Sequence, residues 1–215
     1  MKPGTNQRQA GFTTLEMIIV VFISIIITAM AIPQYISTSQ YLRIAGDLRA
    51  LNGVTAQAKM RAAANFTHAR VYADLADNAY QLQAWNKAAS CWVADGDPNN
   101  GCITYAGSAP SGPGVLPLSQ GDTYGFGTLT QGPTPGQTTI GQATQCLDNT
   151  ATAIASTACI VFNSRGIPVD NANAPIATGA FYVTNGTVVN GVTVSATGSI
   201  QAWSSSASTA GWHGQ

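Results

Sequence analysis

An apolar run near the start of the chain constrains this protein more than any other feature of its sequence. Residues 12–32 read FTTLEMIIVVFISIIITAMAI, with Glu16 as the only charged residue among them. As an α-helix, these 21 residues would extend about 31 Å, close to the ~30 Å hydrocarbon thickness of a bilayer. Lys2 and Arg8 precede the run, and the positive-inside rule then leaves the N-terminus in the cytoplasm. We therefore expect a single transmembrane helix over residues 12–33.

The carboxylate in this run needs a physical reason, because a charge inside a bilayer costs up to a few kcal/mol. A secretory signal peptide would explain the apolar run, and Ala29-Met30-Ala31 supplies an A-x-A cleavage site. An uncleaved signal anchor would explain the run equally well. Neither interpretation explains Glu16, and neither explains why a helical pattern continues past Pro33.

The segment GFTTLE, residues 11–16, resembles the processing site of type IV prepilins and type II secretion pseudopilins. In those families a short hydrophilic leader, here residues 1–11, ends in glycine, and a membrane peptidase cuts after that glycine. The resemblance implies cleavage between Gly11 and Phe12, N-methylation of Phe12, and Glu16 as the glutamate of the fifth mature position. Pro33 matches a proline that is common in such pilins, whereas Thr14 stands where leucine is usual.

This resemblance implies a structural, non-enzymatic subunit of the bacterial inner membrane, with its head in the periplasm. Its partners would be a prepilin peptidase and N-methyltransferase, and other pilins or pseudopilins that it joins through its N-terminal helix. The assembly would be a type IV pilus or a type II secretion pseudopilus. Within it, the charged amine of Phe12 would pair with Glu16 of a neighbouring subunit, so that neither is a lone charge in an apolar medium. Alternatively, Glu16 only occupies the first helical turn, where the macrodipole favours a carboxylate.

The helical pattern resumes after Pro33 and predicts an amphipathic helix over residues 34–65. Pro33 itself removes one backbone hydrogen bond and should kink or loosen the helix nearby. Spacings of three and four residues then give one stripe on which a sheet can pack, made of Tyr41, Ile44, Leu48, Leu51, Thr55, Ala58 and Ala62.

After residue 65 the pattern changes to short runs bounded by turn residues, which predicts a β-rich head over residues 66–215. The expected strands are ARVYADL, AYQLQAW, CITYAG, ACIVFNS, GAFYVTN, GTVV and VTVSATGSIQAWS, with turns at Asn185-Gly186 and Asn190-Gly191. A Gly- and Pro-rich stretch at about residues 107–141 predicts a long surface loop. The predicted fold class is α+β, pilin-like, with a long N-terminal helix packed on an antiparallel sheet.

The C-terminal part resembles H-type pseudopilins and FimT/FimU-like minor pilins. That family has an F-x-x-x-G element, here Phe162 to Gly166, followed by a β-hairpin with a small-residue turn, here Ala196-Thr197-Gly198. This resemblance favours a low-copy minor subunit over a major one.

Four cysteines allow three pairings, and the simplest joins Cys91 to Cys102 and Cys146 to Cys159. The chain has no C-x-x-C motif and neither histidine lies near a cysteine, which disfavours zinc. Four unpaired thiols are the alternative, although loop-rich exported domains favour disulfides. Disulfides would place the head in an oxidising compartment, the periplasm or the outside of the cell.

Other functional classes find little support in the sequence. His68 and His213 are the only histidines, and no H-E-x-x-H, G-x-S-x-G or phosphate-binding loop occurs, so we expect no enzyme and no cofactor. Asp95, Asp97 and Asn99 alternate as at the start of an EF-hand loop, but the glycine comes one place late and position twelve is Ala106, which disfavours calcium.

The alternative to a structural subunit is a binding protein, namely a minor pilin for DNA uptake or for adhesion at the filament tip. Binding to phosphates needs clustered bases, and Arg165 is the only one after residue 90. The sequence therefore disfavours DNA as a partner. Trp203 and Trp212, near the C-terminus, are the candidate contacts for a surface ligand.

Overall fold

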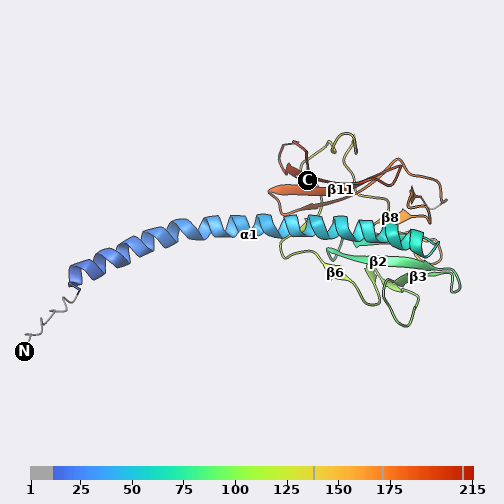
Figure 1. Cartoon of the computed structure of the whole chain (residues 1–215), viewed down its shortest axis with the longest axis horizontal. Coiled ribbons are helices and arrows are strands. Elements are labelled where there is room, and N and C mark those ends of the chain that lie inside the picture. Colours follow the sequence, from blue (N-terminus) through green and yellow to red (C-terminus); the bar gives the residue numbers. More distant parts are fainter. Residues whose placement is uncertain (1–11, 138, 171, 210) are drawn as a thin grey trace, which may run out of the picture. The chain divides into compact units, whose positions relative to one another are not determined.

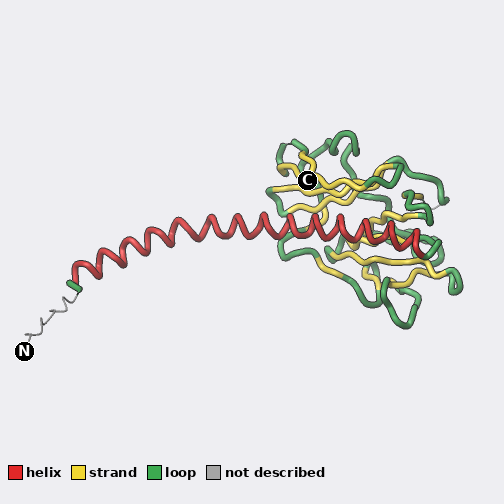
Figure 2. Tube along the Cα trace, viewed as in Figure 1, coloured by secondary structure: helices red, strands yellow, loops and turns green. Residues whose placement is uncertain are grey.

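The computed structural model describes residues 12–137, 139–170, 172–209 and 211–215. The predicted leader, including Gly11, lies outside the described residues. The chain divides into two compact units, one up to Gln40 and one from Tyr41 to Gln215. The helix α1, Thr14–Ala64, contributes to both of them (Figures 1 and 2). A long apolar helix followed by antiparallel sheets gives the α+β class that the sequence predicts.

The first unit is the N-terminal part of α1. It is the one helix, among the described residues, that is long and apolar enough to cross a membrane. Its large apolar side chains are exposed. The hydroxyls of Ser24 and Thr28 donate to the carbonyls of Val20 and Ser24 at 2.7 and 2.9 Å, so they are satisfied inside the helix. The helix continues through Pro33, which costs one backbone hydrogen bond without ending it.

In the second unit, the C-terminal part of α1 buries one face. The predicted stripe is confirmed, except that Tyr41 is 54% exposed. The buried positions of α1 are Ile44, Asp47, Leu48, Leu51, Val54, Thr55, Ala58 and Ala62. The helix ends at Ala64, one residue before the predicted end.

Among the described residues all strand pairings are antiparallel, and they form two main sheets where the sequence predicted one. The first sheet has the order β3-β2-β1-β8-β9 with β6 beside β2, and comprises β1 Ala69–Asp74, β2 Ala79–Asn86, β3 Cys91–Ala94, β6 Leu116–Pro117, β8 Thr157–Phe162 and β9 Pro168–Val169. The second has the order β13-β12-β11-β10-β7, and comprises β7 Thr123–Tyr124, β10 Thr178–Thr184, β11 Val188–Ser195, β12 Ile200–Ser206 and β13 His213–Gly214. A small ribbon pairs β4 Tyr105–Ala106 with β5 Ala109–Pro110.

The main core lies where α1 meets both sheets. Figure 1 shows β11 and β2 on opposite sides of α1. Leu51 on the helix, Val71 and Ile160 on the first sheet, and Phe181 and Val192 on the second belong to one buried apolar cluster. Burial at this scale contributes about 1.5–3 kcal/mol for each large apolar side chain. The helix is therefore the element that joins the two sheets.

The predicted turn at Asn190-Gly191 is wrong, because both residues lie inside β11. Asn190 pairs with Val183 and Gly191 with Tyr182, and the side-chain amide of Asn190 donates to the carbonyl of Ile44 on α1 at 3.0 Å. The predicted turn at Asn185-Gly186 is confirmed between β10 and β11, where Gly186 has φ of +85°. Gly198, in the predicted hairpin turn, has φ of +77° between β11 and β12.

The stretch predicted as a surface loop, about residues 107–141, is wrong in part. It forms β5, β6 and β7, and the last two extend the first and second sheets. It also buries Leu118, Leu129 and Ile140. These apolar side chains are widely spaced along the segment, so they pack it onto the core without producing the periodic pattern by which a strand is predicted. The sequence also missed β3, and the expected strand CITYAG reduces to the two residues of β4.

Candidate functional site

The predicted assembly residues lie at the start of α1. Phe12 is 82% exposed. The backbone N–H and the hydroxyl of Thr13 both donate to Oε2 of Glu16, at 2.9 and 3.0 Å, and the Glu16 N–H donates to Thr13 Oγ1 at 3.3 Å. This reciprocal arrangement is a capping box. A local partner for the Glu16 carboxylate is thus present in the single chain, which the sequence analysis did not anticipate.

The apolar surface of the first unit is large, because its hydrophobic side chains between Leu15 and Ile36 are about half exposed or more. An exposed apolar surface of this kind indicates contact with lipid or with other apolar protein surfaces. An α-helix satisfies its backbone groups internally, and Pro33 interrupts this at one position, so such a segment suits an apolar medium.

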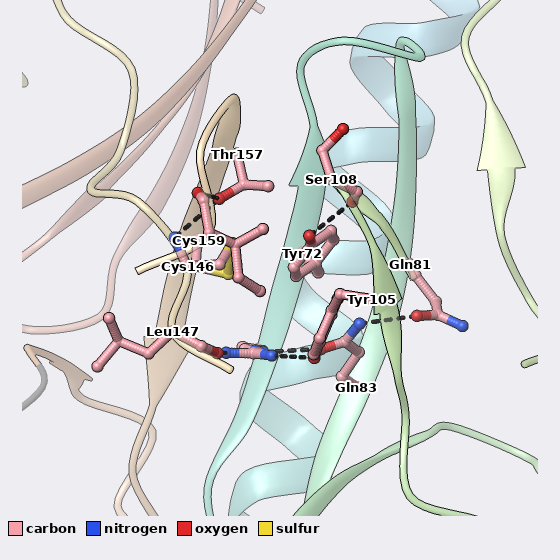
Figure 3. The surroundings of a disulfide bond; sticks show 11 residues. Tyr72, Gln81, Gln83, Tyr105, Ser108, Cys146, Leu147, Thr157 and Cys159 are labelled. Carbon is pink, nitrogen blue, oxygen red and sulfur yellow. Dashed lines mark hydrogen bonds between the residues drawn. A yellow bond between two sulfur atoms is a disulfide. The ribbon is translucent and has the colours of Figure 1, made fainter. Parts of the chain in front are cut away.

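The two disulfides are Cys91–Cys102 and Cys146–Cys159, the local pairs that the sequence analysis favoured. The first ties the segment that leads to β4 onto β3, and the second ties the segment after Gln145 onto β8. Thr157 Oγ1 accepts the Cys146 N–H at 3.1 Å beside the second bridge (Figure 3). Both bridges therefore hold loop segments against the first sheet.

Those two segments cover a buried arginine that the sequence analysis did not single out. Arg70 on β1 is 1% exposed. Its guanidinium donates to Gln83 Oε1 at 2.8 Å, to the Leu147 carbonyl at 2.7 Å and to the Tyr105 hydroxyl at 2.6 Å. It also lies 3.9 Å from the ring centre of Trp92. Burial lowers the pKa of the Arg70 guanidinium to about 10, so it remains charged at neutral pH.

The feature of the sequence that could have indicated this cluster is the alternation of side chains along the strand ARVYAD, residues 69–74. Val71 and Ala73 face α1, so Arg70, Tyr72 and Asp74 must share the opposite face of β1. Tyr72 stacks on Tyr105 with ring centres 5.4 Å apart, and its hydroxyl donates to the Ser108 carbonyl at 2.7 Å. Burial raises the pKa of both phenols. The sequence could place the polar face but could not show what covers it.

A cavity of about 360 Å³ opens beside Arg70. Its walls come from the first sheet and from the loops that follow residues 143 and 169. The aromatic side chains of Trp85 and Trp92 line it, together with polar groups that include His68, Asn149 and Asn173. The carboxyl groups of Asp148 and Asp170 line it too, so the cavity combines charges of both signs with two indole walls.

A second buried polar cluster joins α1 to the segment after β6. Asp47 on α1 accepts the Ser119 N–H at 2.8 Å and the Ser119 hydroxyl at 2.9 Å. Asp122 lies against Asp47, and its Oδ2 is buried without a hydrogen-bond partner among the described residues. Burial, and then the neighbouring Asp47 carboxyl, raise the pKa of Asp122 to about 7, with Arg43 opposing the shift.

The segment considered as a possible calcium loop, which contains Asp95 and Asp97, is a polar turn whose carboxylates already have partners within the chain. Asp95 forms an ion pair with Arg61 on α1 at 3.0 Å. Asp97 accepts the backbone N–H groups of Asn99 and Gly101 at 2.9 and 3.1 Å. These contacts explain the alternating acidic pattern as local turn chemistry.

The other candidate residues are spread over the head. Trp203 donates its indole N–H to Thr193 at 2.9 Å, and Trp212 donates to the Gln131 carbonyl at 3.0 Å. Each indole is half-buried, so neither is a free aromatic contact. The ring nitrogen Nε2 of His68 lies 3.1 Å from Asn173 Oδ1, whereas His213 is exposed on β13. His68 thus lies just before β1 of the first sheet and His213 on the second, so the two form no common site.

Comparison of the chain with protein-family models, with curated proteins and with solved structures found no match. The function is therefore inferred from the residues of the chain itself.

Proposed function

We propose that this protein is a structural subunit of a type IV pilus or a type II secretion pseudopilus, of the low-copy minor class. Its leader would be removed after Gly11 and the new N-terminus at Phe12 methylated. The processed subunit would then wait in the inner membrane with its head in the periplasm. The GFTTLE segment, residues 11–16, supports the processing step.

The observation that carries this proposal is that the two parts of α1 have different surroundings. Up to Gln40 the helix exposes apolar side chains, and from Ile44 to Ala62 it buries one face between two sheets. A helix that is both an apolar surface and part of a head's core suits a subunit that leaves lipid and enters a filament. A plain signal peptide would be cut off near Ala31, and no structural link between the two parts of α1 would then be needed.

The contacts of Glu16 support a role in assembly as well as in capping. Both hydrogen bonds from Thr13 go to Oε2, and within the described residues Oε1 remains able to accept a bond. Cleavage before Phe12 would create an ammonium group, and the first backbone N–H groups of the helix cannot accept a hydrogen bond from it because they are donors themselves. Pairing that ammonium with Glu16 of a neighbouring subunit would neutralise two charges in an apolar filament interior.

Processing is tested by the mass of the mature N-terminus. We expect methylated Phe12 as the first residue and full-length precursor when Gly11 is replaced by a large residue. A mature chain that begins at Ile32 would establish an ordinary signal peptide and end this proposal.

Assembly is tested by comparing Glu16→Ala with Thr13→Val in the same strain. Glu16→Ala should be processed and stay in the membrane, and its fraction in filaments should fall, because losing one partner of a buried ion pair costs roughly 3–5 kcal/mol. Thr13→Val removes the capping hydroxyl but keeps the carboxylate, so it should assemble nearly normally. If the two variants behave alike, Glu16 acts only as a cap, and the pairing with Phe12 is wrong.

A further inference from the structure

The dipeptide Asn-Gly occurs four times in this chain, with its asparagine at Asn52, Asn100, Asn185 and Asn190. In such a pair the backbone nitrogen of the glycine can attack the side-chain carbonyl carbon of the asparagine, which closes a cyclic imide and expels ammonia. Glycine obstructs this attack least, because it has no Cβ. The local chemistry of the four pairs is the same, so the fold decides which of them can react.

Two of the pairs lie inside regular secondary structure. Asn52 and Gly53 are in the interior of α1, where the backbone N–H groups are committed to the helical hydrogen bonds. Asn190 lies in β11 and is 3% exposed, and its side-chain amide donates to the Ile44 carbonyl at 3.0 Å. In both pairs the backbone conformation and the packing keep the glycine nitrogen from the asparagine side chain.

The pair at Asn185 is fixed by its turn between β10 and β11. Asn185 Oδ1 accepts the N–H groups of Thr187 and Val188 at 3.0 and 2.9 Å. The Gly186 N–H donates to Thr184 Oγ1 at 3.0 Å. An attack on the Asn185 side chain would have to break these bonds first, so the turn protects this pair.

The pair at Asn100 lies in the polar turn that follows β3, and both of its residues are exposed. The turn is fixed through the backbone, since the Asn100 N–H donates to the Asp97 carbonyl at 3.2 Å. Among the described residues no group exchanges a hydrogen bond with the side-chain amide of Asn100. This amide can therefore rotate towards the nitrogen of Gly101.

The attacking nitrogen of Gly101 also has a carboxylate beside it. Asp97 Oδ2 accepts the Gly101 N–H at 3.1 Å, within the ~2.6–3.2 Å at which a general base lies from the atom whose proton it removes. Asp97 Oδ1 accepts the Asn99 N–H at 2.9 Å, which holds the carboxylate in this position. The corresponding acceptor in the turn at Asn185 is the neutral hydroxyl of Thr184. An exposed amide, a following glycine and a carboxylate thus meet at Asn100.

We propose that Asn100 is a site of spontaneous deamidation in the folded head, with Asp97 as the base. The Gly101 nitrogen bonds to the side-chain carbonyl carbon of Asn100, its proton passes to Asp97, and that proton leaves with the expelled ammonia. Water then opens the cyclic imide to aspartate or isoaspartate, so that one water is taken up for each ammonia lost. The product adds a negative charge to a turn that already carries Asp95 and Asp97.

The test is a timed incubation of the purified full chain in detergent at neutral pH, followed by mass spectrometry of the peptides that contain the four Asn-Gly pairs. We expect deamidation to accumulate at Asn100 several-fold faster than at Asn52, Asn185 or Asn190. The same chain unfolded in guanidinium, with its disulfides reduced, should lose this selectivity, because each asparagine is then followed by an unconstrained glycine.

Two variants separate the parts played by Gly101 and Asp97. Gly101→Ala would place a Cβ 3.5 Å from Asp97 Oδ2, which is an ordinary contact, so the turn should survive while the reaction slows several-fold. Asp97→Asn keeps an oxygen acceptor but is a far weaker base, so it should slow the reaction in the folded chain and leave the unfolded chain unchanged.

Asp170→Asn is the matched control. Asp170 is also exposed, and its Oδ1 accepts the N–H groups of Ala172 and Ala174 at 2.9 and 2.8 Å in a turn of its own. This variant should deamidate at Asn100 as the original chain does.

Three results would overturn the proposal. They are an Asn100 that stays intact in the folded chain while the unfolded chain reacts, equal rates at the four pairs of the folded chain, and a rate at Asn100 that Asp97→Asn does not lower. The reaction takes place in the head and needs neither processing nor assembly, so none of these results would affect the cleavage after Gly11.

Discussion

Replacing Asp122 by Asn should remove a specific pH dependence of stability. Asp122 is 5% exposed, and its carboxyl meets that of Asp47 beneath Ser119. Tyr80 and Tyr124 are the phenols near the pair, and Arg43 is the nearby base. Asparagine has nearly the shape of the protonated acid, but it cannot ionise.

The sign follows from the raised pKa of Asp122, about 7 in the folded protein against 3.8 ordinarily. Between these values the folded state holds a proton that the unfolded state has lost, so stability falls as pH rises towards 7. At 1.36 kcal/mol per pH unit, the loss between pH 5 and 7 is at most about 2–3 kcal/mol. Screening by solvent reduces the expected loss to about 1–2 kcal/mol.

The assay is urea unfolding of the detergent-solubilised chain at pH 5, 6, 7 and 8, followed by tryptophan fluorescence. All four tryptophans lie after residue 41, so the signal reports the head. Asp122→Asn should match the original chain at pH 5 and exceed its free energy of unfolding by about 1–2 kcal/mol at pH 8. Asp77→Asn, at an exposed carboxyl, is the control and should keep the original pH dependence. A constant difference between Asp122→Asn and the original chain would refute the reasoning.

Three further predictions concern packing, disulfides and DNA. In Gly191→Ala the new Cβ would lie 2.5 Å from the buried Tyr182 ring, so the free energy of unfolding of the head should fall by about 1–3 kcal/mol. Gly53→Ala, which has open space around it on α1, should raise that free energy by up to about 1 kcal/mol. Equal effects of the two variants in urea unfolding would contradict this. Replacing Cys146 and Cys159 by Ala should lower the free energy of unfolding by about 3 kcal/mol, and a variant as stable as the original would argue that the bridge is dispensable. The full chain should show little salt-sensitive binding to duplex DNA; micromolar affinity with a steep salt slope would favour the DNA-uptake alternative.

The helix and most long strands could be predicted because their signals are local and periodic. The apolar stripe from Ile44 to Ala62 repeats at the helical period, and the structure buries that stripe. Turns with a residue type suited to positive φ were also readable, as at Gly186. The turn predicted at Asn190-Gly191 was wrong, because the same dipeptide also fits a strand in which one position needs a buried amide and the next needs a residue without a Cβ. Gly191 makes room for Tyr182, and Asn190 reaches the carbonyl of Ile44.

The sequence by itself determined the apolar N-terminal helix and the change to a β-rich head, and it favoured the local pairing of cysteines, because each depends on neighbours close in the chain. Only the tertiary structure decided that the head has two sheets, that β6 and β7 extend them from a supposed loop, and that Arg70 is buried. The acceptors of Arg70 come from residues 83, 105 and 147, which are up to 77 positions away. No periodic pattern records such contacts, since they depend on which distant segments the core and the disulfides bring together.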